Sequence, residues 1–274
     1  MSELDHELQV AATIAREAAA LVRGYHGKRL IIESKAGNEP VTEADRAASA
    51  LIVERLEVAF PADVVLSEEV PDTRERLGKR RVWMVDPIDG TSDFILGDVG
   101  FVVMIGLSID GRPMVGAVAH PLSEKVYGGV AGVGAWVEAA DGGRTPLRTS
   151  SLAQPPGIRL VASKTHRTTR IDRIKRALQI KDEINVGSVG LKIGLVSSAE
   201  RDLYIYTGGR TKIWDTCGPE AILHGAGGRM TDVDGAPLVY DREDLYNRRG
   251  IVASNGPLHD FVIKTLAPLV DYTD

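Results

Sequence analysis

The chain has 274 residues, which is enough for one large domain or for two compact halves. Its 43% hydrophobic and 26% charged residues are typical of a globular protein, and a net charge of −5 argues against a nucleic-acid surface as its main feature. No apolar window reaches the ~18 residues of a membrane helix, the N-terminal segment lacks the apolar core of a secretory signal, and a single cysteine excludes an internal disulfide. We therefore expect a cytoplasmic protein with no nucleic-acid polymer and no membrane as partner.

The first sixty residues carry two helical patterns. Apolar residues at helical spacing predict a helix from Leu4 to Val22, which Gly24 and Gly27 end. A short strand is expected over residues 30–32. Thr42 is the expected start of the second helix, in which apolar residues recur at spacings of three and four: Ala47, Ala48, Leu51, Ile52 and Leu56.

The rest of the chain divides into two kinds of pattern. Strands dominate residues 64–137, which predicts a largely antiparallel sheet with the two helices laid on it. Strands expected at 158–162, 184–186, 203–206 and 251–253 then alternate with helices expected at 168–178, 192–198, 219–225 and 257–266. Turn-forming residues between 141 and 157 mark the boundary, so we expect an α+β half (1–147) followed by an α/β half (148–274).

The most informative motif is Asp86-Pro87-Ile88-Asp89-Gly90-Thr91, which follows an expected buried strand over residues 82–85. Proline and glycine in these places define a turn that can aim both carboxylates and the Ile88 carbonyl at one point. Such an all-oxygen set suits a hard divalent cation. Asp-Gly is also common in ordinary turns, so the motif taken alone favours a polar turn, and the metal interpretation depends on the other acidic clusters.

Two further acidic clusters strengthen the metal interpretation. Glu68-Glu69 follows an expected strand over residues 64–66. Asp215 lies at an expected helix start, where Asp215 or Thr216 can act as the cap, and helix N-termini favour anions such as phosphate. Carboxylates gathered from strand ends and a helix start repel one another unless cations neutralise them.

At this point the chain resembles a known family. Asp86-Pro-Ile-Asp-Gly-Thr91 together with Trp214-Asp215-x-x-Gly-Pro-Glu220 resembles the paired signature of the inositol monophosphatase superfamily of magnesium-dependent, lithium-sensitive phosphomonoesterases. Glu68-Glu69 and Val41-Thr42-Glu43-Ala44-Asp45 match two further segments, and the similarity extends from about residue 8 to about residue 260. The resemblance implies a layered α/β/α/β/α sandwich with the active site between the halves.

The resemblance also implies a ligand set for two or three Mg²⁺ ions. Glu68, Asp86 and the Ile88 carbonyl would hold the first ion. Asp86, Asp89 and Asp215 would hold the second, so that Asp86 bridges the two. Such ions acidify a bound water, stabilise the leaving oxygen and neutralise the phosphoryl group.

The catalytic residues that the resemblance implies are Asp45 and Thr91. The Asp45 carboxylate would orient the Thr91 hydroxyl, which would contact the attacking water. From the residues alone, Asp45 also fits a first-turn acid stabilised by the helix dipole. The backbone amides of Gly90 and Thr91 would hold phosphate oxygens, and Glu69 would hold a metal-bound water.

Three segments resemble the 3′(2′),5′-bisphosphate nucleotidase branch, which removes the 3′-phosphate from adenosine 3′,5′-bisphosphate. The run Trp214-Asp-Thr-Cys-Gly-Pro-Glu220 is closer to that branch than to inositol monophosphatases. Ser163-Lys-Thr-His166 implies that His166 lies by the nucleotide, and Gly190-Leu-Lys192 implies that Lys192 pairs with a phosphate. Asp215 would also contact substrate. Thr165 replaces the serine usual in the branch, which weakens the inference about base contacts.

Other interpretations stay open. An inositol monophosphatase or related sugar phosphate phosphatase is the alternative enzyme, and a non-catalytic phosphate-binding module is disfavoured because the whole set of implied metal ligands is present. Taken singly, His166 fits a surface or capping residue, Lys192 a solvated one and Cys217 a small packed one. The substrate in every enzymatic case is a small-molecule phosphomonoester. The chain fits a monomer or a homodimer.

Overall fold

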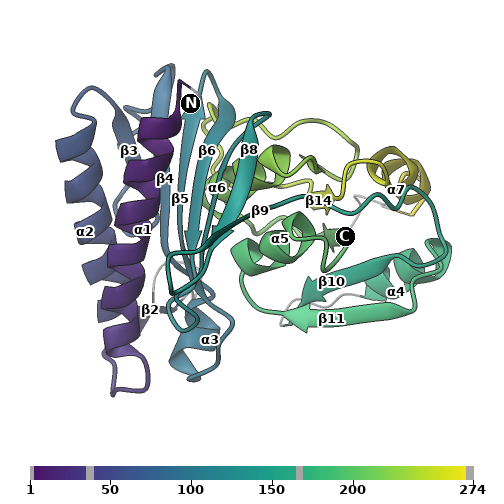
Figure 1. Ribbon diagram of the computed structural model, residues 1–274, viewed down its shortest axis with the longest axis horizontal. Coiled ribbons are helices and arrows are strands. Elements are labelled where there is room, and N and C mark those ends of the chain that lie inside the picture. The colour runs from purple at the N-terminus through teal and green to yellow at the C-terminus, as the bar shows by residue number, and fades with distance from the viewer. Residues whose placement is uncertain (1–2, 35–39, 165–168, 270–274) are drawn as a thin grey trace.

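The computed structural model describes residues 3–34, 40–164 and 169–269. Helices α1 (Asp5–Tyr25) and α2 (Glu43–Ala59) pack against each other and cover one face of a large sheet (Figure 1). A small antiparallel pair, β1 (Ile32–Ser34) and β2 (Pro40–Thr42), precedes α2. Both helices and a strand near residue 32 were predicted from the sequence. Within the described residues, no helix is long and apolar enough to cross a membrane.

The large sheet has seven strands in chain order. They are β3 (Val64–Ser67), β4 (Arg81–Asp89), β5 (Val102–Ile109), β6 (Arg112–Ala119), β7 (Val126–Val130), β8 (Gly134–Glu138) and β9 (Arg144–Pro146). The β3–β4 pair is parallel and the other described pairs in this sheet are antiparallel. The predicted, largely antiparallel sheet is confirmed.

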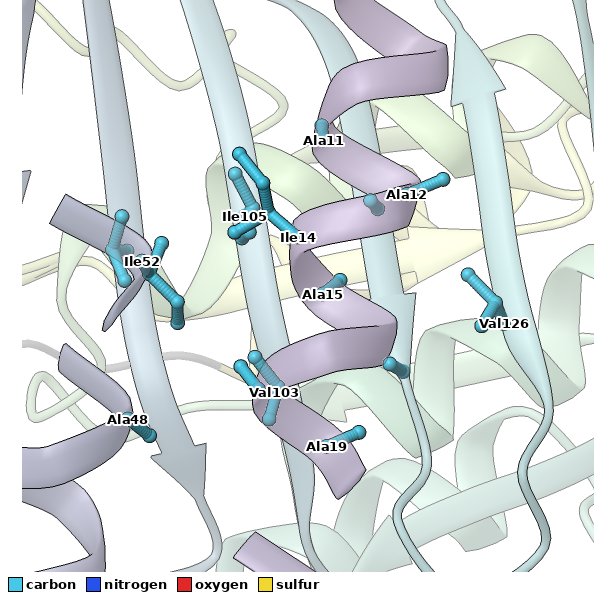
Figure 2. Close-up of a cluster of buried hydrophobic side chains, with 14 of the residues drawn as sticks. Ala11, Ala12, Ile14, Ala15, Ala19, Ala48, Ile52, Val103, Ile105 and Val126 are labelled. Atoms are coloured by element: carbon cyan, nitrogen blue, oxygen red, sulfur yellow. The ribbon is translucent and has the colours of Figure 1, made fainter. Parts of the chain in front are cut away.

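Small residues on α1 allow that helix to approach the sheet closely. Figure 2 shows Ala11, Ala15 and Ala19 of α1 facing the strands, with Val103 and Ile105 of β5 beneath them. Because successive residues of a strand face opposite sides, Val102 and Met104 pack on the other face of the sheet. β5 is therefore buried on both faces, which explains its continuous apolar sequence.

The second sheet has five strands in the order β11-β10-β12-β14-β13. Its strands are β10 (Arg159–Ser163), β11 (Asp182–Val186), β12 (Leu203–Tyr206), β13 (Arg229–Thr231) and β14 (Ile251–Ser254). Helices α5 (Val189–Ser197) and α6 (Ile213–Gly225) lie between the sheets, and α4 (Thr169–Ala177) and α7 (His259–Leu266) cover the outer face (Figure 1). This order of layers confirms the expected α/β/α/β/α sandwich.

Helix α6 packs backbone to backbone on the large sheet. A Cβ at Gly116 would lie 2.0 Å from the Gly218 carbonyl oxygen, and one at Gly106 would lie 2.4 Å from the Gly218 nitrogen. Only glycine permits this approach, which packs α6 on β5 and β6 and brings it into contact with β4.

Two helix starts differ from the sequence predictions. α6 begins at Ile213 and not at Pro219, so neither Asp215 nor Thr216 is its cap; the cap position is Lys212. Pro219, the predicted start, instead lies inside the helix. α5 begins at Val189 with Ser188 as its cap, three residues before the predicted start at Lys192. Strand β13 and the short helix α3 (Thr91–Ile95) were not predicted.

Candidate active site

A bulge in β4 brings Asp86 and Asp89 to one face of the large sheet. In a regular strand, residues three apart point to opposite faces. Here Asp86 pairs with Met104 and Asp89 with Val102, so three steps along β4 oppose two along β5. Because Val102 and Met104 share the face toward α6, both aspartates belong to that face.

The turn after β4 places a hydroxyl between two acceptors. Gly90 has φ of 100°, and a Cβ there would lie 2.5 Å from the Gly100 carbonyl oxygen, so the position requires glycine. Thr91 then begins α3, and its Oγ1 lies 2.9 Å from the Ile88 carbonyl oxygen and 3.3 Å from Asp45 Oδ1. The predicted pairing of Asp45 with Thr91 is therefore present in the structure.

Asp45 is held by the start of α2. Thr42 caps this helix, and its backbone nitrogen and hydroxyl both donate to Asp45 Oδ2, at 2.7 and 2.6 Å. The second oxygen, Oδ1, is the one that faces Thr91. Asp45 is thus both a first-turn acid of α2 and a partner of Thr91.

Glu68 continues β3 beside Asp86. Leu66 pairs with Met84, and both belong to the core cluster on the α6 face. Two residues further on, Glu68 keeps that face, and its backbone nitrogen donates to the Val85 carbonyl at 3.1 Å. Its neighbour Glu69 is half-buried. The ion pair with Glu33 raises the pKa of Arg46, and the charge of Glu69 adds to this effect.

Asp215 occupies the third position of α6. Its Oδ2 accepts the backbone N–H of Lys212 at 2.8 Å, which is the bond that a first-turn acid makes with a helix start. Since α6 packs on β5 and β6 through Gly218 and also contacts β4, its first turn lies near Asp89 and Glu68, whose charges act on Asp215.

The electrostatics show that these acids gather in one place. Burial raises the pKa of Asp86 well above its usual range, and the charges of Glu68, Asp89, Asp215 and Asp45 raise it further. Burial also raises the pKa of Asp215 well above its usual range, with Asp89 and Glu68 adding to the effect. Burial raises the pKa of Asp89, against the opposing effect of Lys192.

Each carboxylate is turned toward a protein donor. Asp89 Oδ2 accepts from Ser188 Oγ at 2.6 Å and from the Gly190 nitrogen at 3.0 Å. Glu68 Oε1 lies 3.3 Å from Lys212 Nζ. Across the described residues, no three His, Cys, Asp or Glu side chains are already closed around one point as a metal cage. The donor set itself, carboxylates with a backbone carbonyl, fits magnesium.

The sequence-predicted substrate residues are placed unevenly. Gly90 and Thr91 lie at the start of α3, next to the carboxylates. Lys192 on α5 is only 3% exposed; its ammonium donates to the carbonyls of Val186 and Gly187 and lies over the Tyr204 ring. His166 lies outside the described residues. Lys192 is therefore a buried cation near Asp89 and Asp215 and not a solvated surface residue.

Sequence reasoning missed two residues that contact the predicted ligands. Ser188 reaches Asp89 because it caps α5, and a serine before an apolar run is a signal for a helix start that was available. Lys212 reaches Glu68 because α6 starts earlier than predicted. No local signal in the sequence pairs residues 68 and 212.

Comparison with known proteins identifies the family. Residues 3–270 match the model of the inositol monophosphatase family. The chain belongs to this family, as the motifs predicted.

Relatives with assigned names are similar over most of the chain. The chain is 36% identical over 244 residues to the 3′(2′),5′-bisphosphate nucleotidase CysQ of Escherichia coli K12, which covers 88% of this chain and 96% of that protein. It is 34% identical over 211 residues to the 3′-phosphoadenosine 5′-phosphate phosphatase of Mycobacterium bovis, covering 74% and 73%. Among solved structures, CysQ of Bacteroides thetaiotaomicron superposes with a TM-score of 0.77 at 28% identity, covering 92% of this chain and 98% of that one.

Proposed function

We propose that this protein is a magnesium-dependent 3′(2′),5′-bisphosphate nucleotidase that hydrolyses the 3′-phosphate of adenosine 3′,5′-bisphosphate. The observation that carries the proposal is the gathering of Glu68, Asp86, Asp89 and Asp215 beside the Asp45–Thr91 pair; burial, with the charges of the other acids, raises the pKa values of Asp86 and Asp215 well above their usual range. The nucleotidase and phosphatase names of its relatives support the substrate. Cys217 is a buried free thiol, which suits the reducing cytoplasm that we propose as its location.

The metal ligands would come from both halves of the chain, which we place at residues 1–147 and 148–274. Glu68, Asp86, Asp89 and the Ile88 carbonyl belong to the first half, and Asp215 belongs to the second. When bound, two or three magnesium ions would neutralise the phosphoryl oxygens and make an adjacent water more acidic. The site therefore forms only when the two sheets are held together. Helix α6 does this, because it packs on the seven-stranded sheet and connects β12 to β13 of the five-stranded sheet.

Thr91 and Asp45 would orient and deprotonate the attacking water. Thr91 carries one hydroxyl hydrogen and has two acceptors within reach, Ile88 O and Asp45 Oδ1. When the hydroxyl donates to Asp45 Oδ1, its lone pairs are free to accept a hydrogen from water. Asp45 cannot turn away, because Thr42 holds its other oxygen with two hydrogen bonds. A water proton would then pass to Thr91 Oγ1 as the threonine proton passes to Asp45 Oδ1.

Lys192 and His166 would select the bisphosphate nucleotide. The Lys192 ammonium lies near Asp89 and Asp215, whose charges raise its pKa, although burial lowers that pKa overall to about 8. A second phosphate entering the cleft would exchange the carbonyl partners of this ammonium for a stronger anionic one.

The test is a side-by-side turnover assay with adenosine 3′,5′-bisphosphate and inositol 1-phosphate, in magnesium and in excess chelator. We expect the nucleotide to be preferred in kcat/KM and all activity to stop in chelator. A preference for inositol 1-phosphate would favour the alternative, an inositol monophosphatase. Full activity in chelator would refute the metal mechanism itself.

A further inference from the structure

One lysine contacts a proposed metal ligand directly. The Nζ atom of Lys212 lies 3.3 Å from Glu68 Oε1, and the two side chains are only 12% and 17% exposed. The pair joins the end of β3 in the first half to the start of α6 in the second. A shielded pair of this kind interacts more strongly than an ion pair on an open surface.

The position of this ammonium is set by groups other than Glu68. It lies over the rings of Trp214 and Tyr246, at 5.2 and 5.8 Å from their centroids. The backbone is fixed as well, since Lys212 forms a β-bridge with Tyr246 and its carbonyl accepts from Asn247 Nδ2 at 3.1 Å. Contacts with Trp214, Tyr246 and Asn247 therefore hold the lysine in place, and Glu68 extends toward it.

Lys212 differs from Lys192, the other buried lysine near the carboxylates, because Lys212 contacts a carboxylate directly. Lys192 donates to the backbone carbonyls of Val186 and Gly187, so it acts on the carboxylates through its field. Lys212 shares an oxygen of Glu68 that a metal ion would need. Its backbone N–H also donates to Asp215 Oδ2 at 2.8 Å, so the residue contacts two of the proposed ligands.

We propose that Lys212 is a built-in counter-ion that occupies Glu68 in the metal-free protein and gives it up to magnesium, so that its charge sets the affinity of the site for the metal. The proposal rests on the proposed function, because it needs Glu68 to be a metal ligand. It assigns to this lysine a positioning role that works before any substrate arrives. The cost of displacing the ammonium is part of every magnesium-binding event.

The experiment measures magnesium binding by isothermal titration calorimetry on chelator-treated protein without substrate. Lys212→Met should bind Mg²⁺ at least about tenfold more tightly than the wild type, since a competing positive charge is gone; tenfold corresponds to ~1.4 kcal/mol. Lys212→Gln should behave like Lys212→Met, and Lys212→Arg, which keeps the charge, should stay within about threefold of the wild type. Lys175→Met is the matched control, because Lys175 also pairs with a glutamate, Glu183, but on α4 and β11 (Figure 1).

Thermal unfolding supplies a second readout. Without metal, Lys212→Met and Lys212→Gln should melt below the wild type, because the ion pair between Lys212 and Glu68 is lost; saturating Mg²⁺ should close that gap. Equal affinity in wild type and Lys212→Met would overturn the proposal, and weaker binding would show that Lys212 only orients Glu68. A wild type that binds no Mg²⁺ would refute the proposed function, and the inference with it.

Discussion

The stability of the protein should depend on pH through one glutamate that no metal needs. Glu220 on α6 is only 2% exposed and accepts a hydrogen bond from the Tyr240 hydroxyl. Burial raises the pKa of Glu220 from 4.5 to about 8, although the Tyr240 bond and the charge of Arg112 oppose the change. Near pH 7 the folded protein therefore holds Glu220 mainly as the neutral acid. Burial also lowers the pKa of the neighbouring His224, so their contact is not an ion pair there.

The size of the effect follows from the difference between the two pKa values. A raised folded-state pKa means that the folded protein binds the proton more tightly than the unfolded chain does. The associated stability is complete below pH 4.5 and is lost as the pH rises to about 8. At 1.36 kcal/mol per pKa unit, the loss in the free energy of unfolding over this window is about 5 kcal/mol, of which about 3.5 kcal/mol falls between pH 5 and pH 8.

The perturbation that isolates this loss is Glu220→Gln. Glutamine has the shape of the neutral acid, can still accept from Tyr240, and does not ionise. Urea unfolding of both proteins in chelator, from pH 5 to pH 8, gives the difference in the free energy of unfolding at each pH. Other titrating groups are common to both proteins and cancel in that difference. Glu54→Gln, at an exposed position of α2, is the control and should follow the wild type.

We expect the difference to grow with pH in favour of Glu220→Gln, by about 3.5 kcal/mol over that range. A constant difference would show that Glu220 ionises equally in the folded and unfolded states, which would refute the reasoning from burial. A difference that shrinks with rising pH would mean that the folded protein stabilises the carboxylate. Either result would mean that the Tyr240 hydrogen bond and the charge of Arg112 on β6 balance or outweigh the effect of burial on Glu220.

Three further predictions concern catalysis. Asp89→Asn should abolish turnover, because it removes a proposed metal ligand. The circular dichroism spectrum and the melting temperature should stay near those of the wild type, because the change removes one of several repelling charges. Substantial activity would exclude Asp89 as a ligand. Thr91→Ala should lower kcat by ~10²–10⁴ with little change in KM, and a raised KM with normal kcat would show that Thr91 merely binds phosphate. Lys192→Met should raise KM for adenosine 3′,5′-bisphosphate by roughly tenfold and spare small sugar phosphates; equal effects on both would remove its substrate role.

The elements that could be predicted from the sequence are those whose pattern is local. Alternating and helical spacings located α1, α2, the antiparallel strands and β12, because burial of one face imposes a period on the sequence. The start of α6 could not be located in this way. Its position depends on Gly106 and Gly116 of distant strands, which admit the backbone of Gly218. A contact of this kind leaves no period in either segment.

The candidate site likewise divides into residues that local patterns could place and residues that they could not. Asp86 and Glu68 could be placed together from the strand pattern, since each follows apolar residues that face α6. Asp45 and Thr91 could be paired only through the family resemblance, since each belongs to a separate turn. Ser188 had a capping signal that was overlooked. Lys212 had none, because its contact with Glu68 joins residues that are far apart in the sequence and forms only in the folded protein.

The motif in β4 illustrates why spacing alone did not define a metal site. Two aspartates three residues apart on a regular strand would face opposite sides of the sheet, and one would then lie under the helices α1 and α2. The extra residue between Asp86 and Asp89 reverses the direction of the second aspartate, and Gly90 turns the chain immediately afterwards. The bulge therefore converts a common sequence pattern into two carboxylates on one face. Since a bulge adds a residue to one strand and not to its partner, it is visible only in the pairing of β4 with β5.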